Sequence, residues 1–143
     1  MIYPDNWDEI RREAIARDRH KCVLCGSPKR LEVHHTRESS ILETLMTLCY
    51  SCHNNWANSR SGFKKRFREF NELRLNLEFN QSEINSVREK LIEDINHKRK
   101  EFVERILSHS NVDQRIKESF KKIKGEEAIH DLFRGAMYQK KLF

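Results

Sequence analysis

All four cysteines of the chain lie in two Cys-x-x-Cys pairs, Cys22 with Cys25 and Cys49 with Cys52. Two intervening residues let both sulfurs of a pair reach one ion, and tetrahedral zinc takes four such ligands. We therefore predict a structural zinc site. A complete shell of four thiolates leaves no coordination position for a substrate, so any catalytic chemistry must come from other residues.

Two disulfide bonds, or a redox-active pair, are the alternatives. Disulfides form in an oxidising compartment, yet the chain opens MIYPDNWDE, without the apolar core of a signal peptide. A redox Cys-x-x-Cys belongs to one strand-to-helix motif, whereas here two pairs flank a polar hairpin. The sequence therefore favours zinc. It also predicts a soluble cytoplasmic protein with no membrane partner, because no apolar run is long enough to cross a bilayer.

Three histidines accompany the cysteine pairs: His34 and His35 midway between them, and His53 directly after the last cysteine. Their ordinary pKa near ~6.5 allows them to accept a proton from water at neutral pH. The order Cys-x-x-Cys, Leu-Glu-Val-His-His, Thr-Leu-Cys-x-x-Cys-His closely resembles the HNH endonuclease family. This resemblance covers the stretch from the N-terminus to about residue 57 and implies a zinc-stapled ββα-metal (HNH, or His-Me finger) core.

The resemblance also implies a role for each histidine. His34 and His53 are expected to bind the catalytic divalent ion, and His35 is expected to be the general base. Products would carry 5′-phosphate and 3′-hydroxyl ends. Adjacent residues of a strand point to opposite faces, so the two neighbouring histidines can serve one site only if the strand ends there.

Two positions depart from the family pattern. Thr44 stands where the family has its middle Asn, which fixes the loop behind the base. Ala57 stands where the family often has a second histidine, one helical turn after His53. The expected metal shell therefore has two histidines, completed by water or phosphate oxygens. Such a shell suits Mg²⁺ or Mn²⁺, although imidazole ligands would also accept Ni²⁺ or Zn²⁺.

The surrounding sequence predicts an α+β, mostly helical protein. The face formed by Trp7, Ile10 and Ala14 is expected to pack on the hairpin, and an Asn-x-x-Glu capping box is expected at Asn80. We predict an HNH domain over 1–59 and a helical extension over 60–143. Helices are expected over 5–19, 53–59, 63–79, 82–107, 113–124 and 126–134.

The charge of the chain is uneven. Residues 1–57 contain eight basic and eight acidic residues, so the net charge of +6 lies entirely in residues 58–143. The segment 60–74 is the most basic, and its cations are expected to contact DNA phosphates. The alternative is an ordinary solvated helix face. The cations assigned to DNA are Arg60, Lys64, Lys65, Arg66 and Arg68.

The sequence as a whole predicts a metal-dependent HNH endonuclease that hydrolyses DNA with little sequence specificity, since no base-reading element is evident. The expected cofactors are structural Zn²⁺ and catalytic Mg²⁺ or Mn²⁺. An apolar residue recurs every seven positions, forming a stripe of Phe63, Phe70, Leu77, Ile84 and Leu91. The helices of residues 63–143 are expected to pair through such stripes with each other, with a second copy or with another protein, as in a phage-defence assembly. The alternative is a noncatalytic zinc-dependent DNA-binding or adaptor module of the same fold.

Overall fold

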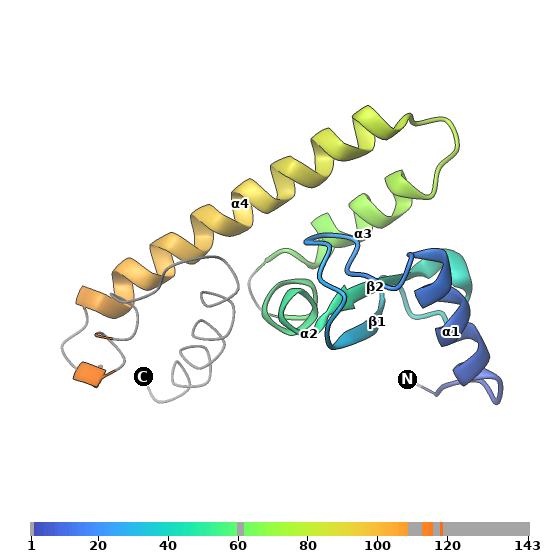
Figure 1. The fold of residues 1–143 in the computed structure, drawn as a ribbon, viewed down its shortest axis with the longest axis horizontal. Helices are drawn as coiled ribbons and strands as arrows, with labels where there is room; N and C mark the ends of the chain where they lie inside the picture. The colour runs from blue at the N-terminus through green and yellow to red at the C-terminus, as the bar shows by residue number, and fades with distance from the viewer. Residues whose placement is uncertain (1, 60–61, 109–112, 116–117, 119–143) are drawn as a thin grey trace. The chain divides into compact units, whose positions relative to one another are not determined.

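Two short strands and a series of helices make up the chain in a computed structural model, which describes residues 2–59, 62–108, 113–115 and 118 (Figure 1). The two strands form one antiparallel sheet, and the predicted α+β, mostly helical class is confirmed at this level. In chain order the elements are α1 (Trp7–Arg17), β1 (Leu31–His35), η1 (Leu42–Thr44), β2 (Leu45–Cys49), α2 (Tyr50–Cys52), η2 (His53–Ala57), α3 (Lys64–Arg74) and α4 (Gln81–Ser108).

Helix α1 lies within the predicted span 5–19. Asp8 and Glu9 occupy its first turn and Arg17 its last, which complements the helix dipole. After α1 the backbone turns sharply, because Arg19 and His20 adopt the left-handed conformation, with φ of 60° and 55°. The amide of His20 then donates to the carbonyl oxygen of Ile15 at 2.9 Å, which closes the helix end.

Strands β1 and β2 form the predicted hairpin, with a register that runs from Leu31 opposite Cys49 to His35 opposite Leu45. Every residue of β2 is buried, so this strand is the centre of the core. The chain then passes directly into α2 and the π-helical turn η2. Trp56 lies on the inner side of η2 with 2% of its surface exposed.

Helices α3 and α4 correspond to the predicted helices 63–79 and 82–107. The capping box at Asn80 is confirmed: its side chain accepts from the amide of Glu83 at 2.9 Å, and its own amide donates to the Glu83 carboxylate at 3.0 Å. Helix α3 ends at Arg74, five residues earlier than predicted. Asn76 accepts from the amide of Glu78 at 2.9 Å, a local turn that competes with the helix. Leu77, expected in the apolar stripe, is consequently fully exposed.

A buried carboxylate joins α1, β2 and α3. The Asp18 side chain, which is 0% exposed, accepts from the Arg17 guanidinium at 2.8 Å and from the Arg74 guanidinium at 2.9 Å. It also accepts from the backbone amide of Thr47 at 2.9 Å. Because the Thr47 amide lies on the edge of β2 that β1 does not cover, Asp18 satisfies a donor that would otherwise be unpaired.

The chain divides into two compact units, Met1–Ile92 and Glu93–Phe143. Helix α3, which the sequence assigned to the extension beginning at residue 60, lies in the first unit together with both cysteine pairs. The helices predicted over 113–124 and 126–134 fall mostly or wholly outside the described residues. Of the helices that are described, none has the length and apolar character needed to cross a membrane.

Candidate metal centre and histidine cleft

The two cysteine pairs sit in turns whose backbone amides point at sulfur. The amide of Cys25 lies 3.5 Å from the sulfur of Cys22, and that of Cys52 lies 3.4 Å from the sulfur of Cys49. Gly26 has a φ of 79°, a left-handed conformation that glycine adopts without strain. In both pairs, therefore, the amide of the second cysteine lies beside the sulfur of the first.

The four sulfurs converge on one point. All of them lie within 4.8 Å of one another, and the sulfurs of Cys25 and Cys49, which come from different pairs, are 3.7 Å apart. A tetrahedral zinc with zinc–sulfur distances of about 2.3 Å places its sulfurs roughly 3.8 Å apart. None of the four cysteines forms a disulfide. The cluster therefore fits a metal such as zinc, as the sequence predicted.

The four thiols alter one another's pKa values. Hydrogen bonding with the Cys22 thiol lowers the pKa of Cys25. Hydrogen bonding with the same thiol raises the pKa of Cys52 well above its ordinary value, and burial adds to this effect. Cysteine binds a metal as the thiolate, and four neighbouring thiolates repel one another. A divalent cation among them would stabilise their ionised form.

The rings of His34 and His53 lie next to each other. His34 is buried, with 6% of its surface exposed, and its ring centroid lies 5.1 Å from that of His53 in an edge-on arrangement. Two imidazoles that bind one ion through nitrogens at about 2.1 Å place their centroids roughly 4.5–5.2 Å apart. The separation therefore suits the two ligands that the sequence predicted.

Glu32 is a member of this group that sequence reasoning missed. Its carboxylate lies 3.5 Å from Nδ1 of His53, and it accepts from the Asn54 side-chain amide at 3.3 Å. Asn54 also donates to the carbonyl oxygen of Tyr50 at 3.0 Å, which fixes its position. The signal was present in the sequence, because Glu32 precedes His34 by two residues and so shares its face of the strand.

Burial governs the protonation of the histidines. Burial, followed by the charges of His53, His35 and Lys64, lowers the pKa of His34 to about 3. Burial, followed by the charge of His53, also lowers the pKa of His35. Both rings are therefore neutral at neutral pH, which is the form that binds a cation or accepts a proton.

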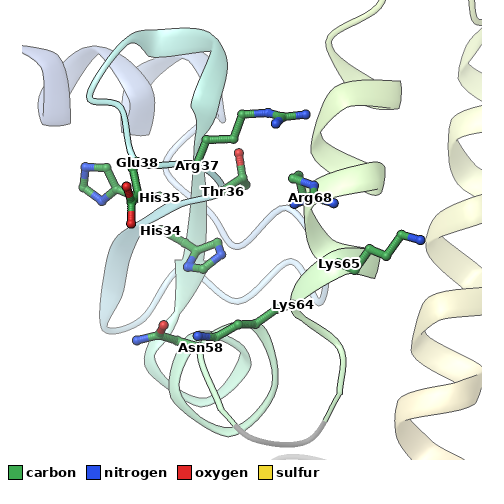
Figure 2. Close-up of a pocket in the computed structure, with 9 residues that line it drawn as sticks. All are labelled: His34, His35, Thr36, Arg37, Glu38, Asn58, Lys64, Lys65 and Arg68. Atoms are coloured by element: carbon green, nitrogen blue, oxygen red, sulfur yellow. The ribbon is translucent and has the colours of Figure 1, made fainter. Parts of the chain in front are cut away.

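His35 leaves the strand on the other side from His34, as Figure 2 shows. Its ring stacks on Trp7 with centroids 4.9 Å apart, and the Tyr3 ring packs against Trp7 at a tilt of 30°, with centroids 4.8 Å apart. Nε2 of His35 is 3.2 Å from the hydroxyl oxygen of Ser40. The predicted apolar face of α1 thus reaches the hairpin through a contact between Trp7 and a predicted catalytic residue.

Thr44, predicted from the resemblance to stand where the HNH family has its middle Asn, holds the loop between the strands. Its hydroxyl lies 2.9 Å from the carbonyl oxygens of Ser39 and Ile41. Its own carbonyl oxygen accepts from both the amide and the hydroxyl of Thr36 at 2.8 Å. A single threonine therefore fixes both ends of the loop that follows His35.

A cleft of about 560 Å³ opens beside these histidines, between β1 and α3 (Figure 2). His34 and His35 lie on one side of it, and three cations of α3, Lys64, Lys65 and Arg68, lie on the other. Arg66 does not line the cleft. Its guanidinium lies 5.9 Å from the ring of Phe63. Arg60 lies outside the described residues.

Comparison of the chain with models of known protein families, with characterised proteins and with solved structures finds no match. The interpretation of the site therefore depends on its own geometry.

Proposed function

We propose that this protein is a metal-dependent nuclease of the HNH type that hydrolyses DNA phosphodiester bonds. The observation that supports it most strongly is the meeting of His34 with His53 beside a cleft whose opposite wall carries three cations. A buried pair of neutral imidazoles suits a divalent cation, and lysine and arginine side chains suit the phosphates of its substrate.

Each group has a separate task in this proposal. A divalent ion such as Mg²⁺ or Mn²⁺ at His34 and His53 would stabilise negative charge on the phosphoryl and leaving oxygens. His35, neutral and held through its Nε2 contact with Ser40, accepts a proton from the attacking water. Lys64, Lys65 and Arg68 hold the backbone across the cleft without reading base sequence.

The test is nicking of supercoiled plasmid at low salt, with and without added Mn²⁺. Wild-type protein is expected to nick only with the metal and to leave 5′-phosphate ends. His53→Ala should reduce the rate at least a hundredfold, while His97→Ala, which removes an exposed histidine paired with Glu101 on α4, should leave it unchanged. Equal nicking by wild type and His53→Ala would reject the proposed ion site.

A noncatalytic DNA-binding module of the same fold is the second candidate, and the position of His35 favours it. A general base and a metal ion must act on the same phosphate, yet the ring of His35 stacks on Trp7 while His34 faces His53. Metal-independent DNA binding with no nicking by the wild-type protein would support this candidate.

A further inference from the structure

A second cavity, of about 500 Å³, lies against the first cysteine pair and the C-terminal ends of α1 and α3. It shares no lining residue with the histidine cleft. Its charged lining consists of five cations and one carboxylate, a surplus of four positive charges. These residues are Arg17, Arg19, Lys21, Arg74, Arg88 and Asp18.

The cations of this cavity are only partly compensated within the fold. Arg17 and Arg74 share the single carboxylate of Asp18. Arg17 also donates to the carbonyl oxygens of Leu42 and Leu45, and Arg74 donates to the Asn71 side chain and to the carbonyl oxygen of Leu45. Arg88 donates to the carbonyl oxygen of Leu24 at 3.1 Å, which neutralises no charge. Within the described part of the chain, Arg19 is exposed and has no acidic partner. The same holds for Lys21. The cavity therefore presents the donors and positive charge of Arg19 and Lys21 to whatever enters it.

Arg19 occupies a backbone position that is unfavourable for it. Its φ of 60° is left-handed, and it stands directly after the end of α1, where glycine is the usual residue. A side chain at this position strains the backbone. Among the described residues, its guanidinium forms no ion pair that would offset this strain. The arginine does, however, place a cation in the lining of the cavity.

We propose that this cavity binds a phosphate group of a nucleic-acid backbone, as a contact separate from the histidine cleft. The choice of nucleic acid rests on the proposed function, whereas the site itself rests on the cavity and its charge. Arginine donors match phosphate oxygens in pairs. The one aromatic ring in the lining, Phe70, is 1% exposed, so no surface is offered for stacking a base. The cavity therefore suits backbone phosphate better than a nucleotide.

The test is the affinity for a labelled DNA duplex of about 20 base pairs, measured across a salt series without added Mg²⁺ or Mn²⁺. The variants are Arg19→Gly, Lys21→Gln and their double. Arg12→Gln, which removes an exposed cation of α1 that does not line the cavity, is the matched control. The double variant is expected to lose about tenfold in affinity, and its log–log salt slope should fall by about one, since the single phosphate contact contributes ~0.9.

Arg19→Gly separates binding from folding. It removes the cation and also relieves the left-handed backbone, so its thermal midpoint is expected to stay level or rise while its affinity falls. If the double variant binds within twofold of Arg12→Gln, the proposal is overturned.

Inorganic phosphate is the second probe, because a free phosphate ion offers the same oxygens. We expect it to displace the duplex only at millimolar concentration. If inorganic phosphate displaced the duplex at a concentration equal to that of the phosphate groups in the duplex, the cavity would be assigned to a small phosphate ligand. That result would overturn the proposed backbone contact. The binding assay contains no catalytic ion, so its result does not depend on nuclease activity. A protein that binds DNA through this cavity but never nicks plasmid with Mn²⁺ added would reject the nuclease and leave this site standing.

Discussion

At the scale of single residues, the two adjacent histidines of β1 have different surroundings. His34 is buried against His53, whereas His35 lies in an aromatic stack with Trp7. The alternation of side chains along a strand imposes this division. It separates the proposed ligand from the proposed base while keeping both at the edge of one cleft.

Glu32 should position His53 for metal binding. A carboxylate beside one ring nitrogen of a ligand histidine fixes its tautomer, so Glu32→Ala is expected to weaken Mn²⁺ binding by about 10–100-fold. Electron paramagnetic resonance titration with Mn²⁺ measures this directly. Glu13→Ala, which removes an exposed carboxylate of α1, should have no effect. Unchanged Mn²⁺ affinity in the Glu32 variant would show that its carboxylate does not orient His53.

The sequence predicted contacts between residues that belong to one motif better than contacts between residues far apart in the chain. The spacing of the four cysteines predicted their convergence, and the motif predicted that His34 and His53 belong together. The stacking of Trp7 on His35 was not predictable, because it depends on how α1 lies against the hairpin. Arg74 was counted with the basic segment, but its partner Asp18 is 56 residues away, and no local pattern reveals such a contact.

At the scale of elements, Asp18 is the connection between α1, β2 and α3. Asp18→Asn keeps the shape of the side chain but replaces the carboxylate, which accepts from two guanidinium groups, with a neutral amide. Removing one partner of a buried ion pair costs about 3–5 kcal/mol. We expect the free energy of unfolding in urea at pH 7 to fall by about this amount. A loss below 1 kcal/mol would contradict the assigned role.

The same residue makes stability depend on pH. Burial acts to raise the pKa of Asp18, but hydrogen bonds from Arg17 and Arg74 outweigh it and hold this pKa below its ordinary value of 3.8. A carboxyl with a lowered folded pKa contributes stability above its unfolded pKa and loses it as pH falls through the folded value. The stability difference between wild type and Asp18→Asn should therefore be constant near neutral pH and shrink below about pH 4. Urea unfolding of both proteins from pH 7 to pH 3 checks this, and a difference that grows in acid would contradict it.

Element boundaries were predictable where a local signal marks them. The Asn-x-x-Glu box placed the start of α4 almost correctly, because both of its hydrogen bonds lie within four residues. The end of α3 was predicted too late, since the seven-residue apolar repeat continues through Leu77 although the side chain of Asn76 starts a turn. The spacing of apolar residues predicts which face of a helix is buried. It does not predict where a competing hydrogen bond to the backbone ends the helix.

At the scale of the whole molecule, the cysteine cluster joins the loop after α1 to the end of β2 and the start of α2. We expect one zinc per chain, measured by elemental analysis. Because binding energy of a structural zinc is also folding energy, Cys52→Ser should lose zinc and the cooperative thermal transition of the first unit. Restoring zinc to chelated wild-type protein should recover that transition. A zinc-free wild type that melts at an unchanged midpoint would contradict the structural role.

The cleft could be anticipated from the sequence only in part. The basic character of residues 60–74 was evident, but which cations face the histidines depends on the packing of α3 against the hairpin. That packing involves long-range contacts such as the hydrogen bond from the Asn71 side chain to the carbonyl oxygen of Glu43 at 3.3 Å. Lys64, Lys65 and Arg68 therefore line the cleft, whereas Arg66 does not.

The most direct measurement is the Mn²⁺-dependent nicking rate of wild type against His35→Ala, with zinc content and thermal midpoint matched between the two. We expect wild type to nick and the variant to lose at least about a hundredfold in rate, because the ring that accepts the proton from water is gone. Nicking at equal rates by both proteins would show that His35 is not the base, and absence of nicking by a zinc-loaded wild type that binds DNA would contradict the nuclease itself.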